Sequence, residues 1–200
     1  MTDDTSHTEK MKALQAEQRK KTDAAAVPDR GLVLVHTGNG KGKSSSAFGV
    51  IARALGWGHH VGVVQFIKGK WITGERQFFD KFPDQLEWHT MGEGFTWDTQ
   101  DEARDIAAAE AAFDRAKTMM ANGSYNLVVL DEINIAMRYD YLSTDAVLEG
   151  LKARDSQTSV ILTGRDAKPE LCDYADLVSE MVEVKHPFKA GLKAKRGVDF

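Results

Sequence analysis

A glycine-rich loop between a short apolar run and a helix-like segment constrains the fold of this chain more than any other feature. The apolar run at 32–36 is too short for a helix and rich in β-branched residues, which is typical of a buried strand. The loop at 37–44 reads Thr-Gly-Asn-Gly-Lys-Gly-Lys-Ser and leads directly into a helix expected over 43–55. A strand, a glycine loop and a helix in this order predict a phosphate-binding P-loop.

Each residue type in this loop suits a phosphate. The glycines let backbone N–H groups approach phosphate oxygens, and the helix N-terminus adds a partial positive charge. Lys43, expected in a solvent-facing loop, can reach the outer phosphates, Lys41 adds a second cation, and the Ser44 hydroxyl can bind Mg²⁺. A glycine-rich turn that binds nothing is a weak alternative. The candidate nucleotide-binding residues are Gly38, Asn39, Gly40, Lys41, Gly42, Lys43, Ser44, Ser45 and Arg53.

Apolar runs and helix-like segments alternate along the rest of the chain. Strands are expected at 60–66, 86–90, 126–131, 159–163 and 176–184, and helices at 75–82, 101–121, 144–154 and 169–174. This alternation predicts an α/β protein with a P-loop, RecA-like three-layer fold and a mostly parallel sheet. Ligands of such sheets bind beyond the carboxyl ends of the strands, where the P-loop also lies.

Two adjacent carboxylates, Asp131 and Glu132, follow the apolar run at 127–130. A P-loop needs a carboxylate near its Mg²⁺, either as a direct ligand or through water. With Ser44, these two residues are therefore the candidate metal ligands. The pattern leaves open which of the two carboxylates binds the ion.

The first 29 residues differ in composition from the rest of the chain. They are polar and charged, and only Met11 and Leu14 begin an apolar stripe, so a helix here would be marginal by itself. We expect a polar N-terminal arm at 1–29, possessing helix formers, and a P-loop domain at 30–200. The arm is either a disordered leader or a segment that orders over a ligand or a partner subunit.

Charge and composition exclude several classes of function. The net charge of −4 argues against nonspecific nucleic-acid binding, although the tail at 185–200 is basic, with Asp199 as its one acid. The tail is either a solvated end or an anchor for an anion or a partner. The single cysteine, Cys172, excludes an internal disulfide and a four-cysteine zinc site. No apolar run approaches a membrane span and the N-terminus does not resemble a secretory signal, so a cytoplasmic protein is expected.

Two further stretches bear on the ligand. Phe95 and Trp97 lie two residues apart in a glycine-flanked loop, where they either cap the core or form an aromatic wall for a large flat ligand. The stretch at 65–76 is expected to bring Lys68, Trp71, Glu75 and Arg76 to the ligand edge. The histidines at 36, 59, 60 and 89 have no metal-ligand spacing and are interpreted as structural or solvated.

Taken together, these segments resemble the P-loop class of corrinoid adenosyltransferase. The matching segments are TGNGKGKSS at 37–45, VGVVQFIKG at 61–69, GER at 74–76, GFTW at 94–97, VVLDE at 128–132, YDYL at 139–142, TGR at 163–165, VKHPF at 184–188 and KAGLKA at 189–194. The resemblance runs from about residue 30 to the C-terminus. Serines stand at 44 and 45 where threonines are common in the family, which keeps the hydroxyls.

The resemblance implies a reaction in which ATP donates its 5′-deoxyadenosyl group to the cobalt of a reduced corrinoid and triphosphate leaves. It implies that Lys41 and Lys43 stabilise the departing triphosphate together with Mg²⁺, and that the loop holds the γ-phosphate end. Phe95 and Trp97 match an aromatic pair that faces the corrin and displaces its lower axial ligand. The arm would act as a lid, lent across a homodimer, and a flavoprotein would supply the electron.

Two other functions keep the P-loop but leave Phe95 and Trp97 without a role. A small-molecule kinase would need an acceptor site and would release ADP. A nucleotide-dependent switch would bind ATP without consuming it quickly. The product therefore separates the three hypotheses: triphosphate, ADP, or neither.

Overall fold

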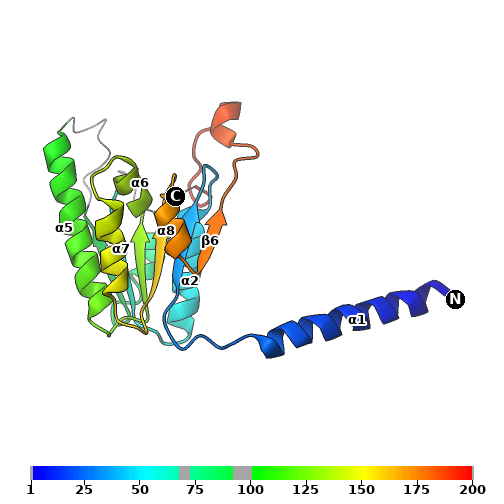
Figure 1. Ribbon diagram of the computed structural model, residues 1–200. Helices are drawn as coiled ribbons and strands as arrows, with labels where there is room; N and C mark the ends of the chain where they lie inside the picture. The colour runs from blue at the N-terminus through cyan, green and yellow to red at the C-terminus, as the bar shows by residue number, and fades with distance from the viewer. Residues whose placement is uncertain (1, 68–72, 92–100, 200) are drawn as a thin grey trace.

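A parallel sheet of six strands forms the centre of the computed structural model, which describes residues 2–67, 73–91 and 101–199, with side chains from residue 7 onward (Figure 1). The strand order is β3-β2-β4-β5-β1-β6, and all five pairings between neighbours are parallel. This confirms the α/β P-loop fold, with a sheet that is parallel throughout. The strands are β1 (Val33–Thr37), β2 (Val61–Gln65), β3 (Leu86–Thr90), β4 (Leu127–Asp131), β5 (Ser159–Thr163) and β6 (Leu177–Glu180).

Helices cover both faces of the sheet, which makes the three layers expected from the sequence (Figure 1). One apolar cluster joins α2 (Lys43–Gly56) and α3 (Gly74–Phe79) to one face. A larger cluster joins the other face to α5 (Glu102–Ala121), α6 (Ile133–Arg138), α7 (Thr144–Lys152) and α8 (Pro169–Tyr174). Alternate residues of β4 enter different clusters, so this strand is apolar throughout because it is buried on both sides.

Side-chain caps explain where several of these helices begin. The Asp101 carboxylate accepts from the backbone N–H of Arg104 at the start of α5, and the Ser143 hydroxyl accepts from Ala146 at the start of α7. Gly123, with a φ of 69°, follows α5 in the left-handed conformation that ends many helices. α6 was not predicted, because it is short and begins at Ile133, just after β4, with no side-chain cap among the described residues and no proline to mark its start.

The last strand is shorter than the 176–184 expected from its apolar residues. In the part of the chain that the structure describes it is an edge strand, paired with β1 from Leu34 opposite Leu177 to Thr37 opposite Glu180. Because β1 ends at Thr37, regular pairing ends at Glu180 as well. Beyond it the chain runs on to a short 3₁₀ helix, η1 (Pro187–Ala190).

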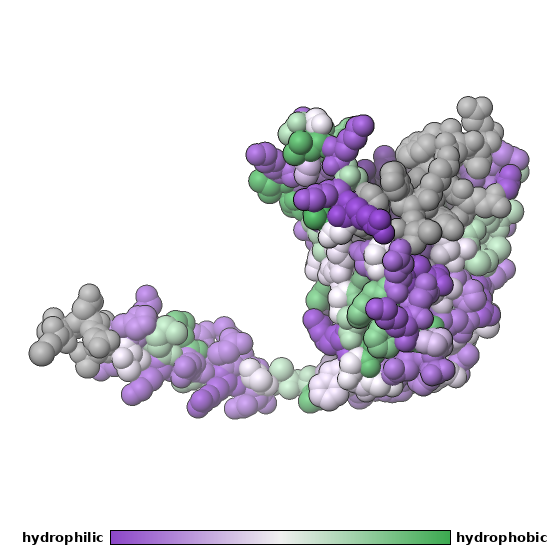
Figure 2. Space-filling view, turned by 180° about the vertical axis from the view of Figure 1, so that it is seen from behind, coloured by the Kyte–Doolittle hydropathy of each residue, from purple (hydrophilic) through white to green (hydrophobic). Residues whose placement is uncertain are grey.

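The N-terminal arm is a single helix, α1 (Thr2–Ala24), that projects away from the domain (Figure 1). All its described side chains are exposed, and its surface is largely hydrophilic in Figure 2. The arm joins the domain at the end of the sheet where the strands begin, opposite the P-loop end (Figure 1). No helix in the described ranges is long and apolar enough to cross a membrane.

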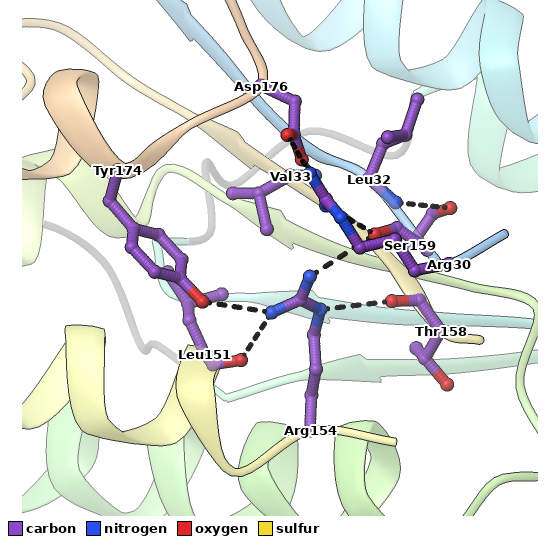
Figure 3. Close-up of polar contacts among 10 residues, drawn as sticks. Arg30, Leu32, Val33, Leu151, Arg154, Thr158, Ser159, Tyr174 and Asp176 are labelled. Atoms are coloured by element: carbon purple, nitrogen blue, oxygen red, sulfur yellow. Dashed lines mark hydrogen bonds and ion pairs between the residues drawn. The ribbon is translucent and has the colours of Figure 1, made fainter. Parts of the chain in front are cut away.

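Two arginines hold the chain where the arm meets the domain (Figure 3). The Arg30 guanidinium forms a two-pronged ion pair with Asp176, at 2.9 and 2.5 Å, and Asp176 also accepts from the backbone N–H of Val33. Arg154 donates to four acceptors that belong to separate segments. These are the carbonyls of Gly31, Leu151 and Thr158 and the hydroxyl of Tyr174 (Figure 3).

A second polar cluster ties the edge strand β3 to α5 and to the turn after it. The Glu87 carboxylate accepts from the Tyr125 hydroxyl and from Arg115, and its Oε1 lies 2.6 Å from Nε2 of His89. The hydrogen bond from Tyr125, then those from His89 and Arg115, lower the pKa of Glu87 to about 2.

His36, another of the histidines interpreted as structural or solvated, is buried, and its Nδ1 lies 3.3 Å from the carbonyl oxygen of Lys43.

Candidate active site

A pocket of about 350 Å³ lies at the carboxyl ends of β1, β2 and β4, where a parallel sheet of this kind binds its ligands. The P-loop supplies one wall, and residues that follow β2, β4 and β5 supply the others. The lining residues are Gly40, Lys41, Gly42, Lys43, Ser44, Ser45, Phe48, Gln65, Thr73, Glu75, Asp131, Glu132, Ile135, Arg165 and Asp199.

The backbone of the P-loop needs its glycines. Gly38 and Gly42 have φ angles of 92° and 114°, a region that side chains disfavour. A Cβ at Gly40 would lie 2.8 Å from the carbonyl oxygen of Met181, whose chain passes beside the loop. Among the described residues, no side chain caps the start of α2, so its first N–H groups can face an anion at the pocket.

Lys43 lies deeper than the solvent-facing position expected for it. It is the first residue of α2 and only 7% exposed, and its ammonium donates to the carbonyls of Gly38 at 2.8 Å and Gly40 at 2.6 Å. The expectation was wrong because the side chain runs back beneath the loop rather than outward. Burial lowers the pKa of Lys43, while the nearby Glu132 opposes that shift.

Asp131 is buried and held at both carboxylate oxygens. Its Oδ1 accepts from the Thr163 hydroxyl at 2.8 Å, and its Oδ2 accepts from the Gln65 amide at 3.0 Å. These two donors come from the strands on either side of β4. Neither donor was predicted as a site residue, because each lies far from Asp131 in the sequence.

Glu132 follows Asp131 in the left-handed conformation, with φ of 64°, and its backbone N–H donates to the Thr163 hydroxyl at 2.9 Å. Burial and then the charge of Asp131 raise the pKa of Glu132 to about 7. A cation beside the two acids would reduce the repulsion between them. Ser44, Asp131 and Glu132 line the same pocket and offer the oxygen donors that Mg²⁺ prefers.

In the described ranges, no three His, Cys, Asp or Glu residues form a group that could hold a metal by themselves. A Mg²⁺ ion here would therefore depend on the Ser44 hydroxyl, phosphate oxygens and water as well as the two acids. That is the usual manner of a nucleotide-bound Mg²⁺, which keeps several waters. The donor set fits the ion, and both acids remain candidate ligands.

The C-terminal tail returns to the P-loop. Lys41 forms an ion pair with Asp199, and Asp199 also accepts from the backbone N–H of Lys195 at 2.8 Å. Asp199 lines the pocket and was missed as a site residue, although it is the one acid in a basic tail. Arg165, which follows β5 in the TGR segment of the family resemblance, also lines the pocket.

The remaining predicted site residues are distributed as follows. Glu75 lines the pocket, whereas Arg76 turns to Asp80 at 2.7 Å and lies over the Trp88 ring. Asn39 lines an adjoining cavity, and Arg53 is exposed in the last turn of α2, outside the pocket, so its role stays a prediction. Four predicted residues, Lys68, Trp71, Phe95 and Trp97, lie outside the described residues.

Comparison with known proteins gives a consistent result over nearly the whole chain. The model of a family described as ATP:corrinoid adenosyltransferase BtuR/CobO/CobP matches residues 29–200. A corrinoid adenosyltransferase of Pseudomonas aeruginosa is 54% identical over 98% of this chain and 97% of its own length. The corrinoid adenosyltransferase CobA of Salmonella typhimurium is 47% identical over 88% of this chain and 89% of its own length, and a corrinoid adenosyltransferase of Escherichia coli is 44% identical over 96% and 98%.

Proposed function

The chain belongs to the ATP:corrinoid adenosyltransferase family, and from that premise we propose how its pocket performs the transfer. The enzyme moves the 5′-deoxyadenosyl group of ATP to the cobalt of a reduced corrinoid and so makes adenosylcobalamin. The observation that carries the proposal is the single pocket that brings the P-loop lysines together with Ser44, Asp131 and Glu132.

In this reaction the electron pair of cobalt(I) attacks the 5′ carbon of the ribose. A cobalt–carbon bond forms, the bond from that carbon to the triphosphate oxygen breaks, and the leaving triphosphate takes the electrons of that bond. Cobalt(I) is already a strong nucleophile, so no side chain has to remove a proton. The protein must align the two reacting atoms and stabilise charge on the leaving group.

The P-loop is the part of the site suited to the leaving group. We place the triphosphate along the open N-terminus of α2, with its γ-phosphate end in the loop, as the family resemblance implies. Lys43 is pre-positioned by its two carbonyl contacts, and Lys41 can exchange Asp199 for a phosphate oxygen. Both cations then face charge that grows during the reaction, which is where electrostatic stabilisation accelerates it.

Mg²⁺ belongs to this proposal as the ion held by Ser44 and one of the two acids. When bound, it would neutralise part of the triphosphate charge. Support for this ion comes from the geometry, because the Ser44 hydroxyl and both carboxylates line one pocket.

Phe95 and Trp97 are proposed to face the corrin and to displace its lower axial ligand, which makes reduction to cobalt(I) easier. Support comes from the resemblance and from the strand before them. β3 ends at Thr90, at the carboxyl end of the sheet, where the pocket also lies. Residues 92–100 follow shortly after it in the sequence. The reductant is proposed to be a flavoprotein, and the enzyme is proposed to act in the cytoplasm.

The arm is proposed to be a lid that one subunit of a homodimer lends to the other. Its helix has 23 residues, so it is about 35 Å long. It leaves the domain at the end opposite the pocket and projects away from it (Figure 1). In this position it does not approach the pocket of its own chain but is exposed for contact with a second molecule. Its exposed polar surface also gives it no place in the domain core.

One experiment tests the whole assignment. The protein is incubated with ATP, Mg²⁺ and chemically reduced cobalamin, the spectrum is followed, and the phosphate product is identified. We expect the spectrum of a cobalt–carbon bond and release of triphosphate. Release of ADP would indicate a kinase, and neither product would indicate a binding module.

A further inference from the structure

Gln65, the last residue of β2, connects the acid pair to the edge of the sheet. Its amide N–H donates to Oδ2 of Asp131 at 3.0 Å. Its amide oxygen accepts from the indole N–H of Trp88 at 3.0 Å and from the hydroxyl of Thr90 at 3.1 Å. All three partners lie on strands beside β2, so one side chain spans three neighbouring strands.

The chemistry of the partners determines which way the amide faces. An indole N–H can only donate, so the atom of Gln65 that faces Trp88 has to be the oxygen. The NH₂ group must then face Asp131, whose ionised carboxylate only accepts. The opposite orientation would leave one donor facing another and one acceptor facing another.

Trp88 is itself a firm anchor for this contact. Its ring centroid lies 5.4 Å from that of Phe48 and 6.1 Å from that of Phe79, and the Arg76 guanidinium lies 5.5 Å over it. Phe48 and Phe79 are buried, so the indole has little freedom to turn. The position of Gln65 is therefore set by packing on the edge strand.

Asp131 receives a matching contact from the other side. Thr163 donates to its Oδ1, and Gln65 donates to its Oδ2, so the plane of the carboxylate is held from both neighbouring strands. Each carboxylate oxygen has two acceptor sites, so the contacts among the described residues leave one on each oxygen for a metal ion or its water. An amide also orients the carboxylate without adding a charge of its own beside the ion.

We propose that Gln65 is a positioning residue for metal binding: it transmits the fixed position of Trp88 to Asp131 and so holds this carboxylate in the orientation in which it serves the Mg²⁺ of bound ATP. This inference rests on the Mg²⁺ site of the proposed function. Donors behind a metal ligand commonly change metal affinity ten- to a hundredfold when they are removed. Removal of the Gln65 amide is therefore expected to lower the affinity for the ion.

The test compares Gln65→Leu, which has a similar size but cannot donate, with Gln77→Leu, an exposed glutamine of α3. Binding of ATP is measured by calorimetry in EDTA and over a Mg²⁺ titration, and binding of Mn²⁺ in the presence of ATP is measured by electron paramagnetic resonance. We expect Gln65→Leu to raise the half-saturating metal concentration about tenfold. Its ATP affinity in EDTA should stay the same, and Gln77→Leu should match the wild type.

Trp88→Phe is the second variant, because it keeps a stacked ring but removes the N–H that orients the amide. We expect Trp88→Phe to raise the half-saturating metal concentration by less than Gln65→Leu does. This variant also provides the test if Gln65→Leu does not fold. Unchanged metal affinity in both variants overturns the inference. The inference is also overturned if ATP affinity falls by the same factor in EDTA and in the presence of metal, because a purely structural role predicts that result.

Asp131→Asn separates this inference from the proposed function. If Asp131→Asn abolishes the metal dependence and the Gln65 and Trp88 variants do not weaken it, only the positioning role fails. If Asp131→Asn leaves the metal dependence intact, the inference fails because Asp131 does not serve the ion, while the proposed Mg²⁺ site then rests on Glu132. If Asp131→Asn abolishes metal binding and Gln65→Leu weakens it, both are supported.

Discussion

Replacing Lys43 with alanine gives the sharpest test of where the triphosphate binds. The ammonium lies under the P-loop, donates to Gly38 and Gly40, and is 7% exposed. In the reaction it would face the charge that develops on the leaving triphosphate. Removal of one such donor in other enzymes costs about 3–4 kcal/mol in the transition state, so turnover should fall about 10²- to 10³-fold.

The same substitution also affects the free protein. Two loop carbonyls lose a charged donor, and hydrogen bonds to charged groups contribute about 1.5–3 kcal/mol each. Most of that loss is offset, because burial penalises the Lys43 charge and water can reach the carbonyls once the side chain is removed. We expect a net destabilisation of about 1 kcal/mol, which lowers Tm by about 2–4 °C for a chain of this length.

The assay is a single-turnover reaction with cobalt(I), ATP and Mg²⁺, in which triphosphate is quantified alongside a thermal melt. Lys152→Ala is the matched control, since Lys152 is exposed in the last turn of α7 at the opposite end of the sheet. The control should keep full activity. Near-normal turnover by well-folded Lys43→Ala protein, or a loss that only tracks its unfolding, would refute the placement of the triphosphate.

Three further predictions concern other parts of the molecule. Deletion of residues 1–29 should change the free energy of unfolding by about 1 kcal/mol or less and preserve ATP binding, because the described side chains of the arm are exposed. The kinetics of corrinoid use should worsen, and unchanged corrinoid kinetics would contradict the lid. Changing Phe95 and Trp97 together to alanine should nearly abolish activity in an assay that starts from cobalt(II) and a mild reductant. In an assay that starts from cobalt(I), the same variant should keep much of its activity. Equal loss in both assays argues against displacement of the axial ligand. Glu87→Gln should destabilise the protein by about 1 kcal/mol at neutral pH after allowance for the 38% exposure of the side chain. Because the pKa of Glu87 is about 2 in the fold and 4.5 ordinarily, that contribution is complete above pH 4.5 and is lost toward pH 2. Urea midpoints of the two proteins should therefore converge in acid, and a constant gap would contradict this account.

Local patterns in the sequence were sufficient for much of the fold. The P-loop at 37–44 needs glycines, lysines and a hydroxyl at fixed spacing, and that spacing is readable without the structure. The strands at 127–131 and 159–163 were identified because burial on both faces demands continuous apolar residues. Asp131 and Glu132 could be predicted as well, since carboxylates directly after such a strand lie at the ligand edge of a parallel sheet.

The network that holds these acids could not be predicted, because it depends on strand order. Gln65, Asp131 and Thr163 are far apart in the sequence and become neighbours only because β2, β4 and β5 lie side by side. No local pattern encodes that order, which arises from long-range pairing of the strands.

The same limit explains the depth of Lys43 and the role of Asp199. The sequence alone determined that the P-loop contains a lysine at position 43 and that the basic tail contains one acid. Only the tertiary structure decided that Lys43 lies beneath the loop and that the tail brings Asp199 to Lys41. Burial and ion pairing depend on which distant segments meet, and those contacts form only when the chain packs as a whole.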